Sequence, residues 1–189
     1  MQQKHRIFIA INLPPEIKSM LMHYAKKYKD LPAKWVDPEN LHITLAFLGN
    51  ISDLELGNVC MAAKKEAVQH VPFSINLTNL SYGPDEKNPK MVWVATEKSR
   101  ELSLLKRGVE EALSEVINFK PEERSFNPHI TLARIQQMAL RMMDLEERPQ
   151  INENLDMSFL VESIEVMESI LKKTGPQYSI VESYRLSDQ

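Results

Sequence analysis

The sequence has one cysteine, five glycines and no long apolar run, and these shortages exclude several classes of protein. A single cysteine, Cys60, cannot form an internal disulfide, which favours a protein of the reducing cytoplasm. No segment approaches the roughly 18 consecutive apolar residues that a membrane-spanning helix requires. The apolar run before Pro14 is too short for the core of a secretory signal. The sequence therefore predicts a cytoplasmic protein without a membrane segment.

A strong excess of positive charge is also missing. The formal net charge is -3, whereas a protein that coats nucleic acid non-specifically needs a broad basic surface. Glycine-rich phosphate-binding loops are absent, so hydrolysis of nucleoside triphosphates at such a loop has no support. These absences do not exclude an enzyme that binds one terminal phosphate.

What the sequence does contain is a pattern of helices and strands that occurs twice. With 189 residues, of which 43% are hydrophobic, the chain can bury a core without a disulfide or a metal. The order helix, strand, helix, strand, strand runs over approximately residues 12–95 and again over approximately residues 96–189. Many strand-turn-strand connections favour antiparallel pairing. The predicted fold class is therefore α+β, with a duplicated helix-strand-helix-strand-strand unit and antiparallel sheets, in one domain over residues 1–189.

The individual elements follow from apolar spacing and from turn residues. Strands are predicted at 6–11, 41–48, 73–80, 91–95, 128–134, 158–167 and 178–186. Helices are predicted over 17–28, from the capping box of Ser52 and Glu55 to Ala67, over 102–116 and over 136–145. The polar segment 149–156 is predicted to be a loop, and 174–176 a turn.

Two of these strands carry the same motif, His42-Ile43-Thr44 and His129-Ile130-Thr131, at positions that differ by 129 minus 42, or 87 residues. Both motifs are followed by Leu-Ala, and both are preceded by a loop that contains Asn and Pro. Side chains alternate across a strand, so the histidine and the threonine of each motif share one face. If the two halves pack around a pseudo-twofold axis, both pairs converge on one cleft.

Two imidazoles on opposite sides of a phosphate have the geometry for displacement at phosphorus. A neutral imidazole removes a proton from attacking water and a protonated one gives a proton to the departing ribose oxygen, each worth roughly 10²- to 10⁴-fold in rate. The hydroxyls of Thr44 and Thr131 can donate hydrogen bonds to the phosphate oxygens. The chemistry of the residues leaves open whether His42 or His129 is the acid.

Arg134, which ends the second motif strand, is predicted to make a charge-assisted contact to the same phosphate. Strict alternation places Arg134 on the face opposite to His129, so a bulge or the strand end must re-aim it. Phe47 occupies the matching place in the first half of the chain. Its ring is expected either to stack on a base or to lie in the core.

No metal or other cofactor is expected at this site. A catalytic zinc ion normally takes three protein ligands, and neither motif strand brings a third. The remaining histidines, His5, His23 and His70, lie in surface contexts and are expected to be solvated.

These motifs and their surroundings resemble the two-histidine (2H) phosphoesterase superfamily, specifically the LigT-like RNA 2',3'-cyclic phosphodiesterases, also called the 2'-5' RNA ligase family. The resemblance runs nearly end to end, through residues 34–49, 126–134 and 175–178. It implies two lobes around a central cleft. It also implies that His42 is the proton donor and His129 the proton acceptor in hydrolysis of a 2',3'-cyclic phosphate, which leaves a 2'-phosphate.

The expected partner is RNA, or a nucleotide, with a 2',3'-cyclic phosphate terminus, and the expected state is a monomer. One alternative is 2'-5' RNA ligase activity at the same site, in which an RNA 5'-hydroxyl replaces water. Another is a non-catalytic module that binds RNA ends or nucleotides. Both histidines and both threonines are present, which argues against the module, because binding alone needs no paired acid and base.

Overall fold

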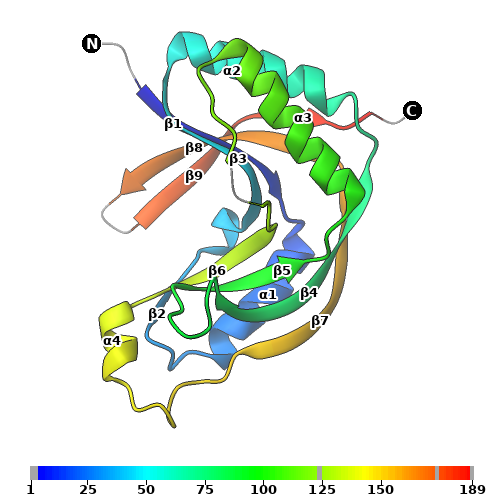
Figure 1. Cartoon of the computed structure of the whole chain (residues 1–189). Coiled ribbons are helices and arrows are strands. Elements are labelled where there is room, and N and C mark those ends of the chain that lie inside the picture. Colours follow the sequence, from blue (N-terminus) through cyan, green and yellow to red (C-terminus); the bar gives the residue numbers. More distant parts are fainter. Residues whose placement is uncertain (1–3, 123–124, 173–174, 188–189) are drawn as a thin grey trace.

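The computed structural model describes residues 4–122, 125–172 and 175–187 (Figure 1). The strands are β1 (Lys4–Asn12), β2 (Ala33–Trp35), β3 (His42–Ser52), β4 (Phe73–Gly83), β5 (Met91–Thr96), β6 (His129–Ile135), β7 (Asn152–Val161), β8 (Ser163–Lys172) and β9 (Gly175–Arg185). The helices are α1 (Pro15–Lys27), the 3-10 helix η1 (Pro38–Asn40), α2 (Asp53–Ala67), α3 (Arg100–Val116) and α4 (Gln137–Met142). Strand pairs within the described residues are antiparallel, which confirms the predicted α+β class.

The described strands pair in the order β7-β4-β5-β6-β3-β1-β8-β9, with β2 also on β6. Between β6 and β3 the pairing shrinks to one residue pair, Ile130 opposite Ile43. This junction divides the molecule into two lobes, as expected. We call the part with β1, β3, β8, β9, α2 and α3 the His42 lobe, and the part with β2, β4, β5, β6, β7, α1 and α4 the His129 lobe (Figure 1).

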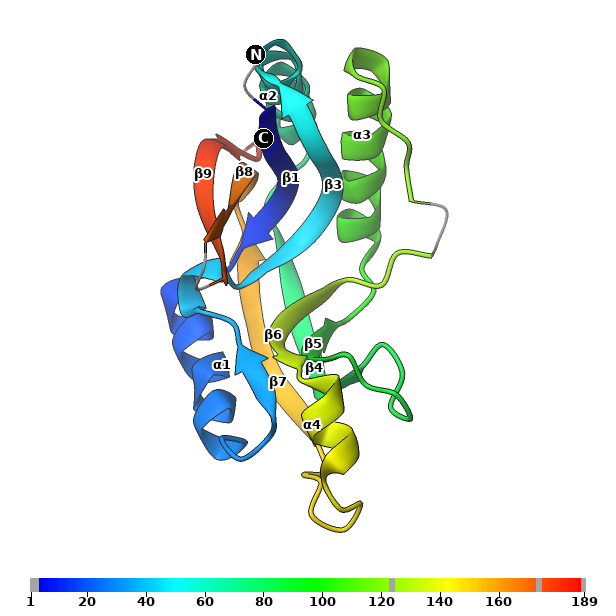
Figure 2. The ribbon, with the colours of Figure 1, turned by 90° about the vertical axis from the view of Figure 1, so that its left-hand side faces the viewer.

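Each lobe takes elements from both halves of the chain. The His42 lobe contains β1, β3 and α2 from the first half, and α3, β8 and β9 from the second. Figure 2 shows α1 and α4 at the opposite end of the molecule from α2 and α3. The chain therefore passes repeatedly between the lobes, and the lobes differ from the two sequence repeats.

Strand β1 is buried on both faces. Ile7 and Ile9 lie in the main core, which also contains the apolar faces of α2 and α3. Phe8 and Ala10 point the other way and form a small second cluster with Met167 of β8. Burial of one large apolar side chain contributes about 1.5–3 kcal/mol. This second cluster supports the side of the sheet on which the site lies.

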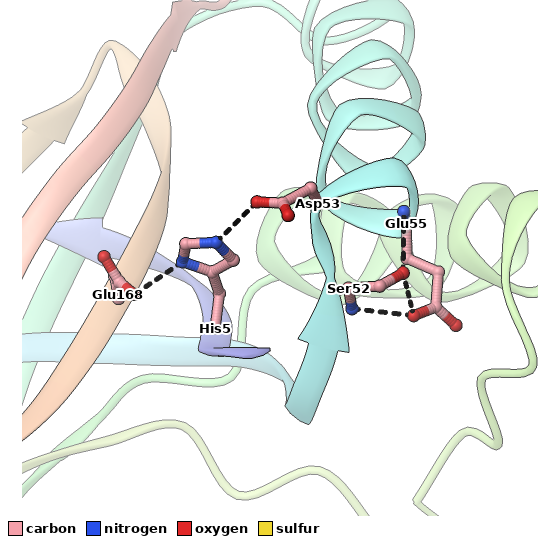
Figure 3. A network of polar contacts seen from close by, with 5 residues as sticks. All are labelled: His5, Ser52, Asp53, Glu55 and Glu168. Atoms are coloured by element: carbon pink, nitrogen blue, oxygen red, sulfur yellow. Dashed lines mark hydrogen bonds and ion pairs between the residues drawn. The ribbon is translucent and has the colours of Figure 1, made fainter. Parts of the chain in front are cut away.

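A polar network ties the outer end of β1 to β8 and α2 (Figure 3). His5 Nδ1 lies 2.7 Å from Glu168 Oε1, and His5 Nε2 lies 2.9 Å from Asp53 Oδ1. The hydrogen bond to Glu168, more than that to Asp53, raises the pKa of His5. The expectation that His5 is solvated is wrong, since its side chain is 13% exposed.

The capping box is confirmed, because Ser52 and Glu55 bond reciprocally at the start of α2.

The largest error of the sequence prediction concerns residues 149–167. The predicted loop contains the first residues of β7, and the predicted strand 158–167 is two strands, because β7 ends at Val161 and β8 begins at Ser163. Within the described residues, β7 is an edge strand paired with β4, so polar residues fill its exposed positions and hide the alternation. The chain then crosses to the His42 lobe.

Smaller differences complete the comparison with the sequence. The three-residue strand β2 was not predicted; it is held by antiparallel pairing with β6, a partner about 100 residues further along the chain. His70 is not solvated as expected, because its Nε2 lies 2.7 Å from Glu66 Oε1. Thr174 of the predicted turn lies outside the described residues. In the part of the chain that the structure describes, no helix is both long enough and apolar enough to cross a membrane.

Candidate active site

A cleft of about 970 Å³ lies between the two lobes. Its lining includes all six residues that the sequence singled out: His42, Thr44, Phe47, His129, Thr131 and Arg134. Its volume is at the upper end of the range for small-molecule sites, roughly 300–1,000 Å³. The expected central cleft is therefore present, and residues from both motifs line it.

The junction of the lobes brings the two motifs together. Ile43 and Ile130, the middle residues of the motifs, face each other as a backbone pair, and both are fully buried. Because side chains alternate along a strand, the flanking histidines and threonines point to the opposite face, which is the wall of the cleft. One backbone pair thus sets the separation of the two catalytic candidates, His42 and His129.

A β-bulge in each motif strand explains how Phe47 and Arg134 reach the cleft. On β3, Ile9 pairs with Ala46 and Ala10 pairs with Thr44, so Leu45 is left over. On β6 the same shift omits Leu132. The Leu-Ala pair after each motif is buried as two consecutive residues, which changes the phase of the alternation. The sequence left open whether a bulge or the strand end re-aims Arg134, and the structure shows the bulge.

Backbone carbonyl groups orient both imidazoles. His42 Nδ1 donates to the carbonyl oxygen of Asn40 at 2.7 Å, and His129 Nδ1 donates to that of Asn127 at 2.9 Å. A carbonyl oxygen can only accept, so each Nδ1 carries a proton and each Nε2 is the atom available for proton transfer. The Thr44 hydroxyl lies 3.1 Å from His42 Nε2.

Among the described residues, two aromatic rings flank His42 and one flanks His129. The ring of Phe8 lies 4.9 Å from the His42 ring and that of Tyr178 lies 5.3 Å away, whereas His129 has Trp93 at 4.7 Å. Burial lowers the pKa of His42 to about 4, against a smaller opposing effect of its hydrogen bond to Asn40. His42 of the free protein is therefore neutral at neutral pH.

Asn40 has a second role that the sequence did not reveal. Its side-chain Nδ2 donates to the carbonyl oxygen of Pro176 at 3.0 Å, and its Oδ1 accepts from the backbone N–H of Tyr178 at 3.3 Å. Strand β9 thereby fixes the residue whose carbonyl group holds His42. The signal in the sequence was the Asn that stands two residues before each histidine, but only pairing with a distant strand gives it this role.

Basic side chains are concentrated in the cleft. Arg6, Lys34, Arg134 and Lys172 line it, against the two acidic residues Asp37 and Glu39. Arg6, which the sequence pattern marked merely as the start of a strand, lies with its guanidinium carbon 5.2 Å from the centre of the Phe47 ring. Phe47 is 54% exposed, so its ring does not belong to the core. The cleft suits an anionic ligand that has an aromatic part.

The described residues contain no cluster of three or more His, Cys, Asp or Glu side chains placed to hold a metal ion. The two motif histidines therefore lack a third protein ligand of these types in this part of the chain. Chemistry that these residues can carry out by themselves is proton transfer through two oriented imidazoles.

Comparison with known proteins gives a consistent result. The family model for LigT like Phosphoesterase matches the chain twice, over residues 9–93 and 92–178. The chain is 32% identical to an RNA 2',3'-cyclic phosphodiesterase of Thermus thermophilus over 96% of this chain and 90% of that protein. It is 30% identical to one of Aquifex aeolicus over 85% of this chain and 87% of that protein. The crystal structure of the Thermus thermophilus protein TT0787 superimposes with a TM-score of 0.85 at 26% identity, covering 97% of this chain and all of the other. The duplicated fold, the cleft and these matches together show that the chain belongs to the LigT-like phosphoesterase family.

Proposed function

We propose that the protein is an RNA 2',3'-cyclic phosphodiesterase that hydrolyses 2',3'-cyclic phosphate ends to 2'-phosphates. The observation that supports this most is the pair of imidazoles, each fixed by a backbone carbonyl and each lining the same cleft. Relatives that are about 30% identical over most of their length carry this activity in their names. An acid and a base on opposite sides of one phosphate are what this reaction needs.

In the proposed reaction His129 takes a proton from water as the water oxygen attacks phosphorus. The bond from phosphorus to the ribose 3' oxygen breaks, and His42 gives that oxygen a proton, which leaves a 3'-hydroxyl and a 2'-phosphate. Thr44 and Thr131 donate hydrogen bonds to the non-bridging oxygens, and Arg134 neutralises their charge. One proton passes from water to His129 and one passes from His42 to the ribose oxygen, so the step needs no metal.

The low pKa of His42 puts a condition on its role as the acid. In the free protein His42 is neutral, because burial disfavours the imidazolium form. A bound phosphate diester brings a negative charge between the histidines, and an opposite charge nearby favours the protonated form. Substrate binding then raises the pKa of His42, so the acid forms where a substrate is present.

Phe47 is proposed to stack on the base of the terminal nucleotide. Its exposed ring stands beside the phosphate site, at the position that Arg134 occupies in the other lobe. Stacking on an aromatic side chain contributes about 1–3 kcal/mol per base and tolerates every base. This contact supports binding of RNA ends without strict sequence preference.

The decisive experiment is to incubate the pure protein with an oligonucleotide that ends in a 2',3'-cyclic phosphate and to identify the position of the product phosphate. A 2'-phosphate is expected, and activity should survive exhaustive treatment with EDTA because the proposed chemistry uses no metal hydroxide. Tight binding without turnover would indicate the non-catalytic module, and loss with EDTA that zinc or magnesium restores would overturn the metal-free mechanism.

Two further parts of the proposal concern the state of the protein. A monomer is proposed, which sedimentation of the pure protein tests. A cytoplasmic location is proposed from the single cysteine, Cys60, whose thiol is half-buried in α2.

A further inference from the structure

A second groove adjoins the cleft at Phe47. This groove has a volume of about 340 Å³ and shares Phe47 with the cleft. Its other lining residues are Leu48, Asn50 and Ile51 of β3, Glu55 of α2, and Ile117, Asn118, Phe119 and Lys120 after α3. The volume lies at the lower end of the range for small-molecule sites, about 300 Å³. Phe47 is therefore the residue at which the two spaces meet.

Phe47 lies at the boundary between the cleft and the groove. The bulge in β3 turns its ring to the cleft side, where the ring of Phe8 lies 6.4 Å away and nearly parallel. Arg6 stands beside the ring, and Arg6 pairs across β1 and β3 with Asn50, which lines the groove. Arg6 is therefore within the cleft and next to the entrance of the groove.

The groove carries groups suited to a nucleotide. Asn50 and Asn118 offer amide groups that hydrogen-bond sugars and base edges, and Lys120 offers an exposed ammonium group. The carboxylate in the groove, Glu55, is committed to the cap of α2, because it accepts hydrogen bonds from the backbone and hydroxyl of Ser52. Cations thus stand on both sides of Phe47, with Arg6 in the cleft and Lys120 in the groove.

The chemistry of the substrate decides what reaches this groove. In a 2',3'-cyclic phosphate both hydroxyl oxygens of the terminal ribose are bonded to the same phosphorus, so the RNA chain continues only through the 5' oxygen. Any second nucleotide therefore precedes the terminal one. With the phosphate between the histidines and the terminal base on Phe47, the groove is the next space along the His42 lobe.

We infer, on the basis of the proposed function, that this groove is a second nucleotide subsite. It holds the nucleotide immediately 5' of the terminal one, and Arg6 and Lys120 contact the phosphate that links the two. The protein then acts faster on the end of an RNA chain than on a cyclic mononucleotide that has the same base.

The test compares kcat/KM for 2',3'-cyclic AMP with kcat/KM for the dinucleotide ApA that ends in the same cyclic phosphate. We expect the dinucleotide to be preferred by about 10-fold at low salt, the effect of one additional charge-assisted contact. The preference should fall as salt increases, because a contact to one more phosphate of a single strand adds a slope of about −0.7. Lys120→Ala and Asn118→Ala should each reduce the preference. Lys64→Ala, which removes the same charge from the exposed face of α2 outside the groove, should retain it.

The outcomes separate this inference from the proposed function. Equal kcat/KM for both substrates would overturn the subsite but not the proposed phosphodiesterase activity. The same holds if Lys120→Ala and Asn118→Ala both keep the wild-type preference for the dinucleotide. If the protein hydrolyses neither substrate, the proposed function is overturned, and the subsite with it. If Lys64→Ala reduces the preference as much as Lys120→Ala does, the subsite is also overturned, because the preference would then depend on the overall charge of the protein.

Discussion

The two motif strands of this protein share a frame and differ in their neighbours. In both, a histidine bonds to the carbonyl group two residues before it, a bulge follows at Leu-Ala, and the strands meet at one isoleucine pair. Around this frame, in the part of the chain that the structure describes, two aromatic rings and an anchored asparagine lie at His42, whereas one ring lies at His129. The bulge presents Phe47 on one side and Arg134 on the other. The repeated frame positions the imidazoles, and the unrepeated neighbours make them unequal.

The largest expected effect comes from breaking the frame on either side. His42→Ala and His129→Ala should each reduce kcat by at least about 10²-fold on a 2',3'-cyclic phosphate, because each removes one partner in proton transfer. The double variant should lose little more than either single variant, since acid and base act as a unit. Steady-state kinetics with circular dichroism as the folding control measures this. Near wild-type turnover in either variant contradicts the mechanism.

The burial of His42 should appear in the pH dependence. His42 is the proposed proton donor, so its pKa sets one limb of each profile, where the fraction of protonated donor changes. In kcat/KM, which reports the free protein, this limb should lie near pH 4. In kcat the same limb should lie at higher pH, because the bound phosphate raises the pKa of His42 in the complex. Measuring both profiles from about pH 3 to 9, a span that includes this pKa and the usual histidine range, tests the difference. If this limb lay at the same pH in both profiles, substrate charge would not reach His42.

The difference between Arg134 and Phe47 gives a third test. Arg134→Ala should raise KM by about 10-fold or more with a smaller change in kcat, because the phosphate is already anionic in the ground state. A loss confined to kcat would mean that the arginine acts on charge that develops during displacement. Phe47→Leu is the companion variant. It should raise KM by weakening the contact with the base, while the contact of Arg134 with the phosphate stays intact.

The smallest effect should come from the asparagines. Asn40→Ala breaks the bonds to Pro176 and Tyr178, so the carbonyl group that orients His42 becomes less fixed, and kcat should fall by about 5- to 10-fold, the worth of roughly one net hydrogen bond. Asn127→Ala is the matched control, since the Asn127 side chain has no hydrogen bond within the described residues, and its loss should be smaller. Equal losses of kcat in the two variants would mean that the side-chain bonds of Asn40 do not help to orient His42.

The sequence predicted part of the frame, because the signals for that part are local. Alternation placed His42 with Thr44 and His129 with Thr131, and the position of Arg134 required either a bulge or the strand end, of which the structure shows the bulge. The carbonyl bonds to the histidines and the pairing of Ile43 with Ile130 were not predicted. The neighbours were not predictable in the same way, because Phe8, Trp93 and Tyr178 reach the histidines through strand pairing between distant segments. Strand β7 was misplaced for a related reason, since an edge strand does not need the apolar pattern of a buried one.

The repeated passage of the chain between the lobes has a consequence for how such a molecule can be divided. A cut near residue 96, between the two sequence repeats, would leave neither lobe whole, because the His42 lobe would lose α3, β8 and β9 and the His129 lobe would lose β6, β7 and α4. The two fragments would have to find each other again to restore even one lobe. By the same reasoning, a polypeptide of half this length could enclose such a cleft only by associating with a second copy of itself and exchanging elements with it.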